Sequence, residues 1–344
     1  MERIISYNEL PCSKGQTIYF RMETDPKLYV ALLSKGYKLI NNISDSNNKT
    51  IYITGRRQDY ACSNTKDYKK IITSQIEDSL EERNITKPIT HDFSYDKLIN
   101  YEYKIPFVLK NESMNGGKEK FLIACEEDYE NLISACTYLI NFLAFNYDKE
   151  DIRYKIDYEK YFTDNFKIQE YIKTPTEYNT TVRLLTTPSN ELLYASLKYN
   201  KPEDLKDETS LLGSLLHNDF PLSTKSIVSN TLSGGENLLI GEDHYDRKQK
   251  ELLKSHNIDS NNFEKVVEAS KEVHEEYQSE LGIICGFDYI YDKERDNWYL
   301  LELHSRPMVG DYAKRNGLPY NTKEERLTAE GRVRATSLSL VLKK

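Results

Sequence analysis

The fold of this chain is decided by residues 285–304, which read CGFDYIYDKERDNWYLLELH. Two strand-like runs rich in aromatic residues flank a polar loop at 293–297, a pattern that predicts a β-hairpin. We take the loop as symmetric about Arg295, and this symmetry fixes the cross-strand register. The register pairs Asp292 with Trp298, Ile290 with Leu300 and Asp288 with Glu302.

The predicted hairpin sets two carboxylates against each other. Asp288 and Glu302 would share one side of the sheet with their Cβ atoms about 4.5–5.5 Å apart, and period-2 alternation puts His304 on that side too. Like charges that face each other repel, so a compensating group is expected, and Mg²⁺ takes carboxylate oxygens together with substrate phosphates. The pattern predicts a divalent-cation site, with a pair of solvated carboxylates on an edge hairpin as the alternative.

A second hairpin upstream carries a lysine and a glycine-containing turn. An apolar strand ends in Lys110, the polar turn 111–118 contains Gly116 and Gly117, and the chain returns as a strand at 121–125. Backbone N–H groups in such a turn can cradle phosphates while the lysine neutralises them. This is not a P-loop, because it lacks the P-loop spacing and leads into a strand. A plain hairpin turn is the alternative.

Strands that alternate with helices predict an α/β layer in the first part of the chain, which we expect to end near 84–88. Helical periodicity predicts a helix at 263–281 that ends at Gly282, with His274 on its exposed surface. The polar segment 200–262 is expected to be loop with short helices. The other expected elements are strands at 16–20, 49–54, 105–110, 166–172, 180–185 and 192–197, and helices at 26–35, at 70–82 and from Asp128 onward.

Composition and charge exclude several classes of protein. The 344 residues include 47 basic and 55 acidic side chains, and the net charge of −8 argues against a dedicated nucleic-acid or anionic-membrane binder. No apolar run approaches the ~20 residues that span a bilayer, and the N-terminus lacks a signal-peptide core. Five scattered cysteines without a CxxC pair predict neither a disulfide framework nor a zinc knuckle. We therefore expect a cytoplasmic protein.

Taken in order, these segments resemble the ATP-grasp superfamily over roughly residues 65 to 315. The matching motifs are Lys87-Pro88 with 105–110, the lid loop at 115–118, the hinge at 169–178, Ser229-Asn230 with 233–235, and Gly286–Asp288 with 301–307. The resemblance implies an α/β (α+β) ATP-grasp fold in three parts. These are an N-terminal α/β domain at 1–85, a lid sub-domain at 86–172 and a C-terminal mixed-sheet sub-domain at 173–344.

The same resemblance implies roles for individual residues. Glu170 to Ile172 would line the adenine, Glu177 would accept the ribose hydroxyls, and Lys70 is the best candidate for the first ATP lysine. The implied nucleotide-binding set is Lys70, Lys110, Gly116, Gly117, Glu170, Tyr171, Ile172, Glu177, Lys198 and Asn230. The implied catalytic residues are Arg306, which would face the acyl carboxylate, together with Lys110 and Arg183.

The resemblance also implies two Mg²⁺ ions, with Mn²⁺ as an alternative, on Asp288, Glu302 and His304. The family's usual asparagine is His304 here. Three roles are open for this imidazole: direct ligand, contact through water, or no ligand at all. Magnesium prefers oxygen ligands, which counts against direct ligation.

The activity that the resemblance implies is ATP-dependent ligation of a small carboxylate or amino acid to an amine. The reaction would proceed through an acyl phosphate and give ADP and phosphate. A nucleotide-binding regulatory protein without ligase activity and an ATP-grasp carboxylase or kinase-like member are the alternatives. The implied partners are small-molecule carboxylate and amine substrates rather than nucleic acid or membrane, and a homodimer is left open.

Overall fold

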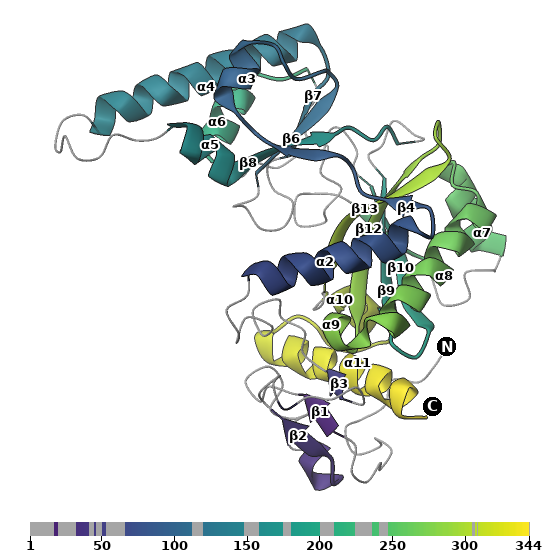
Figure 1. The fold of residues 1–344 in the computed structure, drawn as a ribbon. Coiled ribbons are helices and arrows are strands. Elements are labelled where there is room, and N and C mark those ends of the chain that lie inside the picture. Colours follow the sequence, from purple (N-terminus) through teal and green to yellow (C-terminus); the bar gives the residue numbers. More distant parts are fainter. Residues whose placement is uncertain are drawn as a thin grey trace.

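The computed structural model has a mixed α/β fold built on three separate sheets, shown in Figure 1. It describes residues 17–19, 32–40, 45, 50–52, 66–111, 120–147, 158–174, 180–199, 210–223, 236–240, 247–304, 307 and 309–343. Within these ranges, no helix is both long enough and apolar enough to cross a membrane.

The largest sheet has six strands and contains the predicted hairpin. Its strands lie in the order β11-β10-β9-β12-β13-β4, antiparallel except for the parallel pair β13–β4. The hairpin itself is formed by β12 and β13, near the middle of the sheet. The bounds, in the same order, are Glu236–Ile240, Glu191–Tyr199, Thr181–Thr187, Cys285–Asp292, Asn297–His304 and Ile85–Thr86.

One face of the six-stranded sheet is covered by the helices α2 (Lys66–Glu81), α7 (Arg247–Ser255) and α8 (Ser260–Glu276). Apolar residues at alternate positions of the strands, such as Val182 and Leu184, pack against apolar residues of these helices, such as Val266 of α8. The residues between them on each strand therefore point to the opposite face, because side chains alternate along a strand. This opposite face carries the candidate site described below.

His274 of α8 is fully buried, so the prediction that it lies on the surface is wrong. Its ring nitrogens lie 2.8 Å from Thr186 Oγ1 and 2.6 Å from the carbonyl oxygen of Gly282, so both have partners. Burial lowers the pKa of His274 to about 4, and the ring is neutral at pH 7. His274 follows Ser270 by four positions, which places it on the buried stripe of the helix.

The helix predicted at 263–281 is divided in the structure. α8 ends at Glu276, the next residue Tyr277 has a φ of −108° and a ψ of 35° that are not helical, and the short helix α9 (Gln278–Leu281) follows. Gly282 ends α9 as predicted, with a φ of 83° that lies in the region favouring glycine. The polar segment 200–262 also contains a strand that was not expected, β11, at the edge of the six-stranded sheet.

A four-stranded antiparallel sheet forms a separate layer, at the top of Figure 1. Its strands lie in the order β5 (Thr90–Asp92), β8 (Phe166–Glu170), β6 (Phe107–Asn111) and β7 (Lys120–Ile123). One face packs against α3 (Tyr95–Ile99), α4 (Glu126–Tyr147), α5 (Tyr158–Asn165) and α6 (Leu211–Asn218). Leu109 of β6 and its partner Ile168 of β8 belong to that apolar face, so Lys110, the next residue after Leu109, points to the other face.

The third sheet is parallel and has the order β2 (Lys38–Ile40), β1 (Thr17–Tyr19) and β3 (Ile51–Tyr52). Ile18 packs in one cluster with residues of α10 (Gly310–Arg315) and α11 (Lys323–Lys343), and with Leu185 of β9. Ile76 and Leu80 of α2, by contrast, pack in the core of the six-stranded sheet, where Ile85 of β4 joins them. The chain before residue 86 thus contributes to two of the three layers.

Candidate functional site

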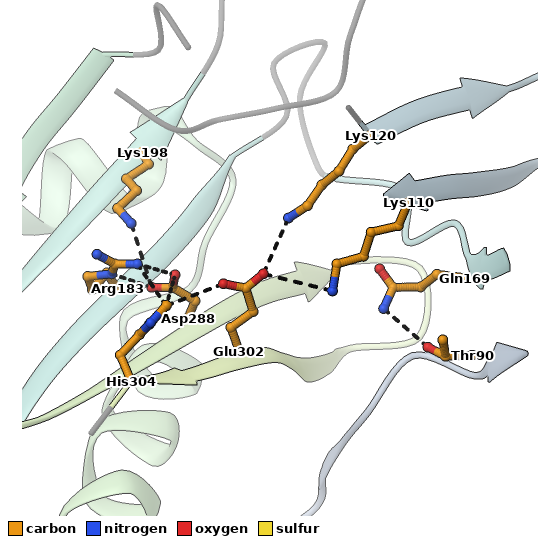
Figure 2. A network of polar contacts seen from close by, with 9 residues as sticks. All are labelled: Thr90, Lys110, Lys120, Gln169, Arg183, Lys198, Asp288, Glu302 and His304. Carbon is orange, nitrogen blue, oxygen red and sulfur yellow. Dashed lines mark hydrogen bonds and ion pairs between the residues drawn. The ribbon is translucent and has the colours of Figure 1, made fainter. Parts of the chain in front are cut away.

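Polar side chains occupy one cross-strand row on the open face of the six-stranded sheet. Ser196 of β10 pairs with Arg183 of β9, Arg183 pairs with Asp288 of β12, and Asp288 pairs with Glu302 of β13. Residues paired directly across strands share one face of a sheet. Figure 2 shows the charged members of this row converging with His304 and Lys198.

The pairing of Asp288 with Glu302 confirms the register predicted at that end of the hairpin. Towards the turn the register shifts by one residue between Asp288 and Tyr289, so the predicted pairing of Asp292 with Trp298 is wrong. Asp292 faces Asn297, and Ile290 faces Tyr299 rather than Leu300. A β-bulge of this kind redirects side chains, and here it adjoins the acidic pair.

Asp288 is held by cations on both of its oxygens. Arg183 donates from Nε to Asp288 Oδ1 at 2.5 Å and from its terminal nitrogen to Oδ2, and Lys198 Nζ lies 3.6 Å from Oδ1. The side chains of Asp288 and Arg183 are 14% and 16% exposed, so this pair is largely shielded from water. Burial alone would raise the pKa of Asp288, but Arg183 and Lys198 together hold it well below its ordinary value.

Glu302 and His304 complete the acidic half of the site. His304 Nε2 lies 3.2 Å from Asp288 Oδ2 and 3.4 Å from Glu302 Oε2. Burial would raise the pKa of Glu302, but His304 and the lysines Lys120 and Lys110 lower it to about 2. Burial would lower the pKa of His304, but the two carboxylates raise it above its ordinary value. Both carboxylates are therefore ionised at pH 7.

His304, the last residue of β13, faces a glycine on the neighbouring strand β12. Gly286 pairs with His304, and a Cβ atom built on Gly286 would lie 3.3 Å from the Cβ of His304 and 3.0 Å from that of Pro307. Contacts this short would force the neighbours to move. The glycine of the Gly-Phe-Asp motif therefore leaves room for the imidazole beside the two carboxylates.

Two lysines reach this site from the four-stranded sheet. Lys110 Nζ lies 3.9 Å and Lys120 Nζ 3.7 Å from the same oxygen, Glu302 Oε1 (Figure 2). Lys110 was predicted from the sequence as a phosphate-neutralising residue, whereas Lys120 was missed. The signal was present, because a hairpin symmetric about position 115 pairs Lys110 with Lys120, and the structure has this register.

The donor set fits a divalent cation. One ligand atom each from Asp288, Glu302 and His304 can be chosen so that all lie within 4.8 Å of one another. Two ionised carboxylates are the ligands that Mg²⁺ prefers, and an imidazole beside them is also accepted by Mn²⁺ or Zn²⁺. The three residues that the sequence predicts as metal ligands are thus brought together, from two adjacent strands.

The site also fits an anion. Among the described residues its cationic side chains are Lys110, Lys120, Arg183 and Lys198, against two carboxylates, so positive charge is in excess within this described set. In addition, the hydroxyl of Ser196, next to Arg183 in the row, is buried and has no hydrogen-bond partner among the described residues. This oxygen is shielded from solvent, so a ligand could reach it only if neighbouring side chains moved, and the fit to an anion rests on the cationic side chains.

The hinge residues predicted to line the adenine lie at the end of β8. Glu170 Oε1 accepts a hydrogen bond of 2.5 Å from Arg295 in the turn of the β12–β13 hairpin, which ties the two sheets together. Ile172 is 4% exposed, and burial raises the pKa of Tyr171. Val108 and Leu122 are also buried, on the same face of the sheet as Lys110. This face of the sheet thus carries apolar side chains next to cationic groups.

The remaining predicted residues are not placed. Lys70 lies in α2, but its side chain is outside the described part of the structure. The predictions for Gly116, Gly117, Glu177, Asn230 and Arg306 fall outside the described residues altogether.

No protein-family model matches the chain, and no curated protein sequence matches it significantly. Solved structures that it is similar to include D-alanine–D-alanine ligase from Bacillus anthracis, at 10% identity over 96% of this chain and 99% of that one, with a TM-score of 0.41. An L-amino acid ligase from Bacillus licheniformis gives 10% identity over 94% and 75%, with a TM-score of 0.39.

A third structure is the ATP-grasp ligase PsnB in complex with a minimal precursor, at 12% identity over 77% of this chain and 61% of that one, with a TM-score of 0.34. All three of these proteins are described as ligases. Similarity at this level carries no functional argument, and the function is inferred from the site itself.

Proposed function

We propose that this protein is an ATP-dependent carboxylate–amine ligase that uses Mg²⁺ and forms an acyl phosphate. The observation that carries the proposal is the convergence of Asp288, Glu302 and His304 with Arg183, Lys198, Lys110 and Lys120 between two sheets. A phosphoryl group in transfer carries negative charge, and its transfer depends on positioning and on groups that balance that charge.

Each described residue has a role in this proposal. The carboxylates Asp288 and Glu302, with His304 beside them, would hold the divalent cation, which when bound neutralises charge on the β- and γ-phosphates. Lys110 would steady the phosphates from the lid sheet, and Arg183 would offer its planar guanidinium to a phosphate or carboxylate. Glu170, Tyr171 and Ile172 would line the adenine.

The roles of the predicted residues that lie outside the described part of the structure are proposed from the sequence resemblance alone. Arg306 would hold the substrate carboxylate, Glu177 the ribose, and Lys70, Gly116, Gly117 and Asn230 the nucleotide phosphates. The division at 1–85, 86–172 and 173–344 is proposed on the same basis.

The proposed reaction has two steps. First, a carboxylate oxygen attacks the γ-phosphorus of ATP, the bond to the β-phosphate oxygen breaks, and ADP leaves. Second, an amine attacks the acyl carbon, the carbon–oxygen bond to phosphate breaks, and the nitrogen loses a proton to give an amide. Exclusion of water between the two sheets would protect the acyl phosphate from hydrolysis.

The proposal is tested by ATP- and Mg²⁺-dependent phosphate release against pooled amino acids and small carboxylates. We expect release that requires a particular pool and an amine, and that is lost in Glu302→Gln. Glu268→Gln is the matched control, because Glu268 lies on α8, on the face of the sheet opposite the site, and pairs with Lys271 at 2.8 Å.

Other results would identify the alternatives. Bicarbonate dependence would indicate a carboxylase, and a stable phosphorylated product would indicate a kinase-like enzyme. ATP binding without release in any pool would favour a nucleotide-binding regulatory protein.

A further inference from the structure

Three lysines lie in one cross-strand row of the four-stranded sheet. Lys120 of β7 pairs with Lys110 of β6, and Lys110 pairs with Lys167 of β8. Like charges at adjacent positions of a sheet destabilise it unless each finds a counter-charge. Lys167 finds one within its own sheet, because its Nζ lies 2.5 Å from Oδ1 of Asp92, its direct partner on β5.

Lys120 finds its counter-charge in the other sheet. Its Nζ lies 3.7 Å from Glu302 Oε1, as Figure 2 shows, and its side chain is 21% exposed. A separation of 3.7 Å makes an ion pair but is too long for a hydrogen bond. The contact is therefore easily exchanged, and a lysine side chain has the length and freedom to move to a new partner.

Glu302 has no oxygen free of cationic partners in this arrangement. Its Oε1 faces Lys110 and Lys120, and its Oε2 lies 3.4 Å from Nε2 of His304. A divalent cation that binds Glu302 must compete with these positive groups. A group that draws the lysines away would make the carboxylate a better metal ligand.

We propose that Lys120 exchanges Glu302 for a phosphate oxygen when a nucleoside di- or triphosphate binds, and that this exchange couples nucleotide binding to binding of the divalent cation. The inference rests on the proposed function, because it assumes that a nucleotide occupies the space between the sheets. A phosphate oxygen carries more negative charge than a carboxylate oxygen and can approach to hydrogen-bond distance, so it is the stronger partner. Coupling of this kind is reciprocal, and each ligand strengthens the binding of the other.

The experiment measures ADP binding by isothermal titration calorimetry, with Mg²⁺ and with a chelator, and binding of Mn²⁺ alone by electron paramagnetic resonance. The variants are Lys120→Met and, as matched control, Lys167→Met, which removes a lysine from the same row that already has Asp92 as partner. Formation of metal–ADP in solution affects all three proteins equally, so differences between them report on the protein.

For Lys120→Met we expect ADP binding in chelator to weaken by about tenfold, as for loss of one charge-assisted contact. Binding of Mn²⁺ alone should strengthen by about fivefold, because one competing ammonium is gone. The factor by which metal improves ADP binding should fall by about fivefold. Lys167→Met should match the wild type in all three measurements.

Two results would overturn the inference while leaving the nucleotide proposal intact. One is a Lys120→Met protein that behaves like Lys167→Met. The other is weakened ADP binding with unchanged metal coupling, which would make Lys120 an ordinary phosphate contact. If the folded wild-type protein binds no ADP at all, both the inference and the proposed function are wrong.

Discussion

Replacing Lys198 with Met should stabilise the ligand-free protein while weakening its binding of nucleotide. The Lys198 side chain is 10% exposed, and burial, together with Arg183 beside it, lowers its pKa to about 8 despite the attraction of Asp288. The ordinary value is 10.5, so at pH 7 the folded protein pays for a charge that the unfolded chain carries freely. The lowering corresponds to about 3 kcal/mol at 1.36 kcal/mol per pKa unit.

The sign of the pH dependence follows from the same shift. Between pH 8 and pH 10.5 the unfolded chain binds the proton more tightly than the folded protein does, so the wild type gains stability as the pH rises through this range. Lys198→Met lacks this gain. The variant should therefore be more stable than the wild type by up to about 3 kcal/mol at pH 7, with the difference shrinking towards pH 10.

The assay is urea denaturation of both proteins in a chelating buffer at pH 7 and pH 10, with ADP binding measured in parallel. Lys271→Met serves as control, because Lys271 is a lysine of α8 that pairs with Glu268 outside the site. ADP binding should weaken by about tenfold in Lys198→Met, as for loss of one charge-assisted contact. A variant less stable than the wild type at pH 7, or a stability difference that does not change with pH, would refute this reasoning.

Three further predictions concern the same sheet and the helix α8 that packs on it. Asp288→Asn leaves the buried guanidinium of Arg183 without its counter-charge and should lower the free energy of unfolding by about 3–5 kcal/mol, measured by urea denaturation; an unchanged midpoint would contradict it. Because the pKa of buried His274 is lowered to about 4, the wild type should lose about 3 kcal/mol as the pH falls from 6.5 to 4, and His274→Gln should show a flatter profile over that range. Gly286→Ala should push against His304 and weaken Mn²⁺ binding by about tenfold in a resonance titration, whereas unchanged affinity would show that the close approach is unimportant.

The acidic half of the site was predictable from strand alternation and hairpin symmetry alone. Those two rules bring Asp288, Glu302 and His304 to one side of one sheet, where the structure has them. The register near the turn was not predictable in the same way. The bulge leaves Leu301 unpaired between Leu300 and Glu302, and neither a glycine nor a turn residue marks this position in the sequence. A bulge here is selected by the packing and twist of the whole sheet.

The cationic half was only partly predictable. Symmetry within the β6–β7 hairpin is enough to pair Lys120 with Lys110, as the structure shows. That both lysines meet Glu302 depends on how two sheets dock, and no local pattern encodes a contact between segments so far apart in the chain. His274 illustrates a different error: it lies seven residues after apolar Val267, a spacing that keeps both on one face of the helix, but its polarity suggested the surface.

The most direct test of the proposed ligase chemistry follows an oxygen atom. Amino acids and small carboxylates labelled with ¹⁸O in the carboxyl group are incubated with the protein, ATP, Mg²⁺ and an amine, and the released phosphate is analysed by mass spectrometry. If the carboxylate attacks the γ-phosphorus, one labelled oxygen passes into the phosphate when the amide forms. Phosphate released without label would show that water attacks ATP, and would contradict activation of the carboxylate as an acyl phosphate.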